Sequence, residues 1–157
     1  MLPNELARQQ KAKLQLATGL SVVGVLIVGV LAVVQSFPSP FWIWVLFALA
    51  FVFFEWNTVE VNDKLYASPS VMVILTGAVA FGPDSAILGC VAMAALGPLQ
   101  PADIRERRWF QPLANFGQLV ISASIAVTVL VVVMGGQDVQ TFNIWRVALA
   151  SALAAVT

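Results

Sequence analysis

Few side chains in this chain could do chemistry, and the most suggestive group lies in the apolar segment 113–134. Asn115, Gln118 and Ser122 are spaced three and four residues apart, so they share one side of a helix and form a polar stripe. Amide groups are unfavourable against lipid, so we expect this stripe to face other helices. There it either joins helices by hydrogen bonds or contacts a ligand, and the spacing leaves both roles open.

Charged side chains gather beside two other apolar segments. Glu55 follows the aromatic run 41–54, and we expect it to make a contact within a helix bundle or with a ligand. Arg105, Arg107 and Arg108 lie in segment 99–111, which has the highest density of charge in the chain. These arginines predict a cytoplasmic basic loop that faces anionic lipid headgroups. A docking surface for a cytoplasmic partner is the alternative.

Catalysis within these residues is not expected. The chain has no histidine, which removes the usual general base and the commonest zinc ligand. Its single cysteine, Cys90, lies inside an apolar run, where a small packing residue is expected. The apolar segments hold no Ser–Lys pair, paired aspartates or set of metal ligands. We therefore predict no catalytic residue, no metal site and no cofactor.

The composition is that of a membrane protein. Hydrophobic residues make up 60% of the 157 residues and charged residues only 10%, whereas a soluble domain carries about 25% charged residues. The formal net charge is zero, which argues against a nucleic-acid partner because phosphate binding needs a basic surface. The expected partner is the lipid bilayer.

The apolar runs predict an all-α, polytopic transmembrane helical bundle of about six spans. A basic leader, residues 1–13, precedes a first run that is long enough to cross the bilayer, since about 20 residues are needed, and too long for a signal peptide. The last run ends at Thr157 without a polar flank, so we expect it to be truncated. The predicted spans are residues 14–35, 41–56, 69–82, 84–98, 112–134 and 144–157.

Short segments lie between the longer spans. Residues 58–62 alternate polar and apolar side chains, which predicts a brief extended piece at the interface. The runs 70–81 and 85–96 each end in Gly-Pro and are short for a bilayer, so they predict a central helical hairpin. This hairpin either spans fully or re-enters. Asp84 at its tip favours the full hairpin, because a carboxylate is costly at mid-membrane.

The basic residues orient the chain. With alternating spans, every Lys and Arg except Arg146 lies on the same side as the N-terminus. Basic flanks stay in the cytoplasm during insertion, so we expect a multi-pass protein of the bacterial cytoplasmic (inner) membrane with a cytoplasmic N-terminus. An even number of spans returns the C-terminus to the cytoplasm.

From Phe54 to about Leu130 the pattern resembles the N-terminal integral-membrane sensor module of bacterial HD-GYP/GGDEF-type signalling proteins. The match comprises an acidic residue after an aromatic run, a Val-Glu-Val stretch, a serine pair, a Gly-Pro turn, a basic loop and a polar helix. The matching positions are Glu55, Val59 to Val61, Ser68, Ser70, Phe81-Gly82-Pro83, Ala86, Arg105 to Arg108, Leu113, Asn115, Gln118 and Ser122.

This resemblance implies a sensory or anchoring module. The chain has no histidine-aspartate pair and no GGDEF-like loop, so the cyclic-dinucleotide phosphodiesterase or cyclase domain of such proteins would be attached downstream of residue 157. A small solute-binding transporter subunit, of the six-helix substrate-capture type, is the main alternative, and a purely structural membrane protein is another. The sequence leaves a homodimer open.

Overall fold

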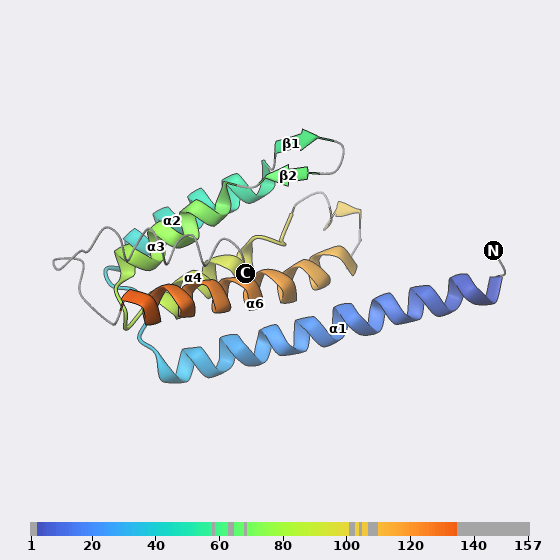
Figure 1. The fold of residues 1–157 in the computed structure, drawn as a ribbon, viewed down its shortest axis with the longest axis horizontal. Coiled ribbons are helices and arrows are strands. Elements are labelled where there is room, and N and C mark those ends of the chain that lie inside the picture. Colours follow the sequence, from blue (N-terminus) through green and yellow to red (C-terminus); the bar gives the residue numbers. More distant parts are fainter. Residues whose placement is uncertain are drawn as a thin grey trace.

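The computed structural model describes residues 3–57, 59–62, 65–67, 69–100, 103, 105–106 and 110–134. Five helices and one pair of strands account for most of them (Figure 1). The predicted last span, 144–157, lies outside the described residues. The elements are α1 (Pro3–Val34), α2 (Phe41–Trp56), β1 (Val59–Asn62), β2 (Leu65–Ala67), α3 (Ser70–Phe81), α4 (Ala86–Leu96) and α6 (Phe110–Met134).

Local sequence sets the helix ends. The segment between α1 and α2 contains Pro38 and Pro40, which cannot donate backbone hydrogen bonds and so separate the two helices. Helix α3 ends at Gly82, whose φ of 75° lies in the left-handed region that glycine adopts without a steric penalty. The carbonyl of Gly82 then accepts the backbone N–H of Ala86 at 2.8 Å, and α4 begins there. The predicted helical hairpin of α3 and α4 is confirmed.

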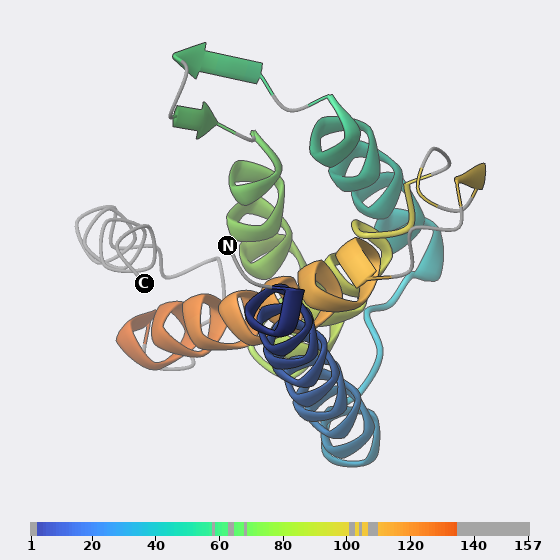
Figure 2. The same ribbon diagram turned by 90° about the vertical axis from the view of Figure 1, so that its right-hand side faces the viewer.

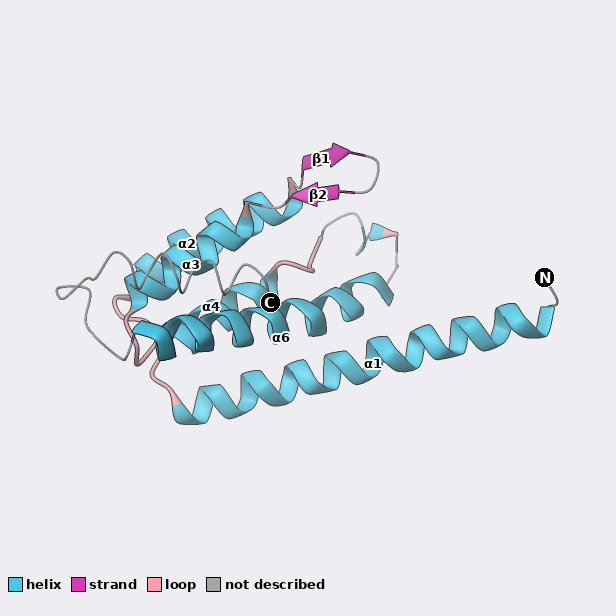
Figure 3. Cartoon of the chain, viewed as in Figure 1, coloured by secondary structure: helices cyan, strands magenta, loops and turns pink. Residues whose placement is uncertain are grey.

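The helices lie side by side and alternate in direction along the chain (Figures 1 and 3). Helices α1, α3 and α6 run one way, whereas α2 and α4 run the other. The N-terminus, both strands, the end of α4 and the start of α6 therefore lie at one end of the bundle. We call this end the N-terminal end. The basic leader continues into α1 as helix, so α1 has 32 residues and a length of about 48 Å.

Helix α4 occupies the centre of the bundle (Figure 2). It packs against α1, α2, α3 and α6. Small side chains make this position available, because they let neighbouring helices approach closely. Cys90, Val91, Met93 and Ala94 have no exposed surface, and Phe51 of α2 is likewise fully buried beside them.

Helices α1 and α6 form the most extensive pair; they run in the same direction in Figure 1, and Figure 2 shows that they cross at an angle. Their contact also depends on small residues. Gly117 of α6 lies so close to α1 that an added Cβ would overlap the backbone carbonyl of Leu20. A Cβ on Gly24 of α1 would lie 3.3 Å from the Cα atom of Gly117. Beside this contact, the Ser21 hydroxyl donates a hydrogen bond to the Leu113 carbonyl at 2.6 Å.

Large apolar side chains cover the outside of the bundle. Val33 of α1 is 86% exposed, Met72 of α3 is 70% exposed and Val132 of α6 is 71% exposed. Apolar patches of this extent are atypical of a soluble monomer and mark a surface that meets lipid or another protein. Such a surface around a core of small residues is typical of a protein that packs its helices within lipid.

Six membrane spans are not supported. Among the described residues, only α6 and the segment Arg8–Val34 of α1 are long and apolar enough to cross a bilayer. Helices α3 and α4, with 12 and 11 residues, reach only about 18 Å and 16 Å, less than the roughly 30 Å of hydrocarbon. Helix α2 has 16 residues and reaches about 24 Å.

The bundle is helical, but its N-terminal end also carries a two-stranded antiparallel hairpin. Strand β1 pairs with β2, with Glu60 opposite Tyr66 and an irregularity before Asn62. The expectation of an extended piece at 58–62 is confirmed for residues 59–62. Its pairing with β2 was not predicted; apart from this hairpin the described fold is all-α, as expected.

Candidate functional site

Glu55 lies where the ends of three helices meet. It is in the last turn of α2 and is half-buried. The hydroxyl of Ser70, at the start of α3, donates a hydrogen bond to Oε2 of Glu55 at 2.6 Å. Ser70 is only 3% exposed. A short hydrogen bond to a carboxylate is stronger than one between neutral groups, so this pair links α2 firmly to α3.

The end of α4 joins the same junction through Trp56 and Gly97. The indole N–H of Trp56 donates to the Gly97 carbonyl at 3.2 Å. A Cβ on Gly97 would lie 3.2 Å from Cγ of Glu55, so glycine permits this close approach. We call Glu55, Trp56, Ser70 and Gly97 the Glu55 junction. It connects α2, α3 and α4 at the N-terminal end of the bundle.

The opposite end of α2 is attached to α4 by a second set of contacts. The indole N–H of Trp44 donates to the Gly89 carbonyl at 2.9 Å. Close by, the Oε1 atom of Gln35 accepts the backbone N–H of Leu88 at 2.8 Å. A Cβ on Gly89 would lie 2.5 Å from Cγ of Pro38, so the loop after α1 lies directly on α4. Helix α2 is therefore bound to α4 at both ends.

The segment from α4 to α6 continues from the Glu55 junction. It begins at Gly97 and reaches Phe110, where α6 starts. Arg105 and Glu106 are exposed in it. Arg107 and Arg108 lie outside the described residues, so the predicted basic loop is placed only in part.

The polar stripe lies on an exposed side of α6. Asn115, Gln118 and Ser122 are all exposed, whereas Gly117 and Val120 are buried against the other helices. No described helix covers the stripe, so the expected helix contact is absent among the described residues. The structure does not bring the stripe together with Glu55. A role for the stripe in binding a ligand stays a prediction.

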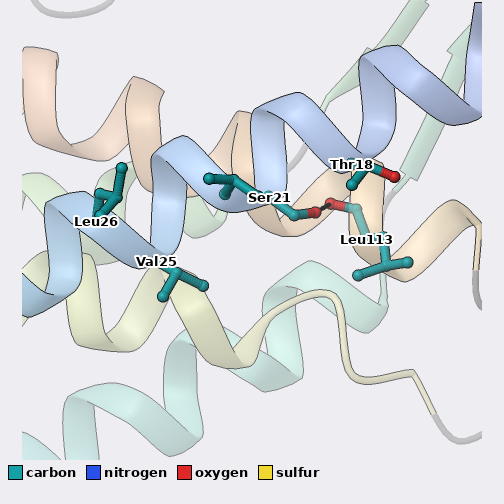
Figure 4. A pocket seen from close by; sticks show the side chains of 6 residues that line it. Thr18, Ser21, Val25, Leu26 and Leu113 are labelled. Atoms are coloured by element: carbon teal, nitrogen blue, oxygen red, sulfur yellow. Dashed lines mark hydrogen bonds between the residues drawn. The ribbon is translucent and has the colours of Figure 1, made fainter.

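A groove between α1 and α6 was not predicted from the sequence (Figure 4). Its volume is about 340 Å³, and it is open to the outside. Five residues of α1 and one of α6 line it: Thr18, Ser21, Val22, Val25, Leu26 and Leu113. The Ser21 hydroxyl is engaged by the Leu113 carbonyl, so the lining is almost wholly apolar. The one sequence signal for this contact is the run of small residues Ala17, Ser21 and Gly24, which lie on one face of α1 and permit a close helix approach.

The described residues offer no metal site. No group of three or more His, Cys, Asp or Glu side chains in that part of the chain could hold an ion. Cys90 is fully buried, and its thiol lies 3.3 Å from the Ile74 carbonyl, to which it donates. Its position fits the packing role expected from the sequence.

Exposed apolar helices around a core of small residues, with charged segments at one end, define a helical membrane protein. Comparison with known protein families agrees with this class. The chain belongs to the MASE9 family of membrane-associated sensory domains, whose family model matches residues 25–156. No curated protein and no solved structure matches the chain.

Proposed function

We propose that this chain is the membrane-embedded sensory module of a bacterial signal-transduction protein. The observation that carries the proposal is the MASE9 match over residues 25–156, which includes the last third of α1 and every later described helix. The effector would be a cytoplasmic domain of the cyclic-dinucleotide phosphodiesterase or cyclase type, attached downstream of residue 157. Catalysis would belong to that domain.

The proposed topology is a multi-pass module of the cytoplasmic membrane with its N-terminus in the cytoplasm. Two observations support it: the helices alternate in direction, and the described cations Arg8, Lys11, Lys13 and Arg105 belong to segments at the N-terminal end of the bundle. Basic residues mark the cytoplasmic side. The short helices α2, α3 and α4 would complete about six spans together with segment 144–157, either fully or as re-entrant elements sheltered by α1 and α6.

In the proposed mechanism, a stimulus changes helix packing and the Glu55 junction transmits the change. The junction links three helix ends through two hydrogen bonds. Helix α4 packs along α6, and a Cβ on Gly97 would lie 3.3 Å from a side-chain atom of Leu119, so a shift of α4 would displace α6. A signal of this kind requires that the stimulus stabilise one of two helix arrangements more than the other.

The reading frame beyond Thr157 provides the first test. We expect it to continue into a soluble domain with a cyclic-dinucleotide signature. The full-length protein in vesicles would then be assayed for turnover of a cyclic dinucleotide. A stop codon directly after Thr157, or a downstream domain with no signalling chemistry, would overturn the proposal and favour the transporter-subunit or structural alternatives.

Variants of the Glu55 junction test the mechanism in that full-length protein. Glu55→Leu and Ser70→Ala should each change the basal output, and their effects should be less than additive in the double variant because both changes remove the same bond. Asp84→Asn is the matched control, since Asp84 is exposed in the turn between α3 and α4 at the opposite end of the bundle. Equal output from wild type and both junction variants, with folding retained, would refute the junction's role.

The polar stripe is tested separately. Replacing Asn115 and Gln118 together by Leu keeps side-chain size but removes both exposed amides. If the stripe contacts a ligand or another helix that affects signalling, the output of the full-length protein should change. Unchanged output in a folded double variant would exclude a signalling role for the stripe.

A further inference from the structure

The groove between α1 and α6 has the lining expected for an aliphatic ligand. Val22, Val25 and Leu26 are 53%, 60% and 62% exposed, and Leu113 closes the groove from α6. Two hydroxyl groups line the groove, and that of Ser21 is occupied by its bond to Leu113. The other belongs to Thr18, at one end of the groove, and makes no described bond to α6. Few polar groups remain to orient a polar ligand, whereas a hydrocarbon chain needs none.

A cation lies beyond the polar end of this groove. Lys11 precedes Thr18 by seven residues, which places it on the same face of α1 at a distance of about 10 Å along the axis. Arg8 lies one turn further, and both side chains are exposed. Lys13 is also exposed, but it lies about 140° around the helix from Thr18.

The order of these groups along α1 matches a phospholipid. Glu5 is the described carboxylate on this part of α1, and it lies beyond Arg8, further from the groove than either cation. Arg105 and Glu106 are exposed in the segment before α6 and have opposite charges. The face of α1 therefore presents cations first, then Thr18, and then an apolar groove.

We propose that the α1–α6 groove binds one acyl chain of an anionic phospholipid whose phosphate is held by Lys11. The proposal rests on the membrane position given under the proposed function, and it names a ligand class for the sensory module. An acyl chain in the groove would contact both α1 and α6. The lipid would thereby stabilise the packing of α1 against α6.

Photocrosslinking in bilayer nanodiscs tests the proposal on the full chain. The probe is a phosphatidylglycerol with a photoreactive group on one acyl chain, diluted into unlabelled lipid, and the crosslinked residues are mapped by mass spectrometry. We expect saturable labelling within residues 18–26 and at Leu113. A probe with the same acyl chain on phosphatidylcholine should label these positions about five-fold less, because one cation favours an anionic headgroup by about that factor.

Two pairs of variants at exposed positions make the test specific. Lys11→Gln should reduce labelling about five-fold, whereas Lys13→Gln removes the same charge from another face and should leave it unchanged. Val25→Trp should fill the groove and abolish labelling. Val30→Trp is its control, because Val30 is 61% exposed on α1 but does not line the groove. Retained protection of buried Cys90 from thiol reagents shows that each variant is folded.

Three results would overturn the proposal. Labelling spread evenly over the exposed faces of α1 and α6 would indicate only ordinary boundary lipid. Equal loss in Lys11→Gln and Lys13→Gln would remove the specific role of Lys11. Efficient disulfide formation between two chains carrying Val25→Cys would show that a second copy covers the groove. Cyclic-dinucleotide output is a separate readout, so specific labelling without any output would leave the lipid site standing while the proposed signalling function fails.

Discussion

Gly117 offers the sharpest test of how α1 and α6 pack. Its replacement by Ala would place a Cβ atom over the carbonyl carbon and oxygen of Leu20 and 2.7 Å from the Leu20 Cβ atom. Carbon atoms prefer separations of about 3.5–4.0 Å. The obstructing carbonyl atoms belong to the helix backbone and cannot rotate away, so α1 and α6 must move apart.

The expected cost follows from this overlap. Overpacking of a close contact costs about 1–3 kcal/mol. Separating the helices would also stretch the bond from Ser21 to Leu113, and interhelical bonds of this kind contribute about 0.6 kcal/mol on average. The higher helix propensity of Ala offsets up to about 1 kcal/mol. We therefore expect Gly117→Ala to lower the free energy of unfolding by about 1–2 kcal/mol.

Matched glycines on α1 provide the controls for this prediction. Nothing lies within 4 Å of a Cβ added at Gly19 or Gly29, so Ala at either position should be neutral or slightly stabilising. Gly24→Ala should be intermediate, since its nearest neighbour is a Phe116 side-chain atom at 3.0 Å. Unfolding is measured in mixed micelles by titration with a denaturing detergent. If Gly117→Ala is as stable as Gly29→Ala, the close contact of α1 and α6 is refuted.

Three further perturbations test individual contacts. Ser21→Ala removes the bond to the Leu113 carbonyl and should lower the free energy of unfolding by about 0.6 kcal/mol in the same titration. Gly89→Ala brings a Cβ to 2.5 Å from Pro38, so it should displace the loop after α1 and cost about 1–3 kcal/mol. Cys90 is fully buried and should resist a membrane-permeant thiol reagent until the bundle unfolds, as followed by mass spectrometry.

Each of these perturbations has its own control. Ser124→Ala removes a hydroxyl that bonds only the Val120 carbonyl of its own helix, so its cost should be smaller than that of Ser21→Ala. Gly29→Ala is the control for Gly89→Ala, because nothing lies within 4 Å of a Cβ added at Gly29. Gln10→Cys places a thiol at an exposed position of the polar leader and should react rapidly in a background lacking Cys90. Rapid labelling of Cys90 in the folded protein would contradict the central position of α4.

The sequence anticipated the helices closely, because their limits are local. Apolar runs separated by proline, glycine and charged residues predicted helices at 41–56, 69–82, 84–98 and 112–134. The structure has them at Phe41–Trp56, Ser70–Phe81, Ala86–Leu96 and Phe110–Met134. Whether the shorter helices α2, α3 and α4 cross the membrane stays a prediction, because length alone does not distinguish a span from a sheltered re-entrant helix.

The candidate site was anticipated only in part. Glu55 was identified by its position after an aromatic run, but its partner Ser70 is fifteen residues away and no spacing rule connects them. The stripe of Asn115, Gln118 and Ser122 was correctly placed on one face of a helix, yet the described helices pack against another face. The pattern defines a face but does not identify which neighbour covers it.

Sequence by itself determined that this chain forms apolar helices with its basic residues concentrated in particular segments, because composition and periodicity act over a few turns. Only the tertiary structure decided which helix faces meet. The approach of Gly24 to Gly117, the bond from Ser21 to Leu113 and the groove beside them join residues of α1 and α6, which lie far apart in the sequence. Such contacts depend on the shapes of two helices at once, and small residues permit close approach without specifying the partner.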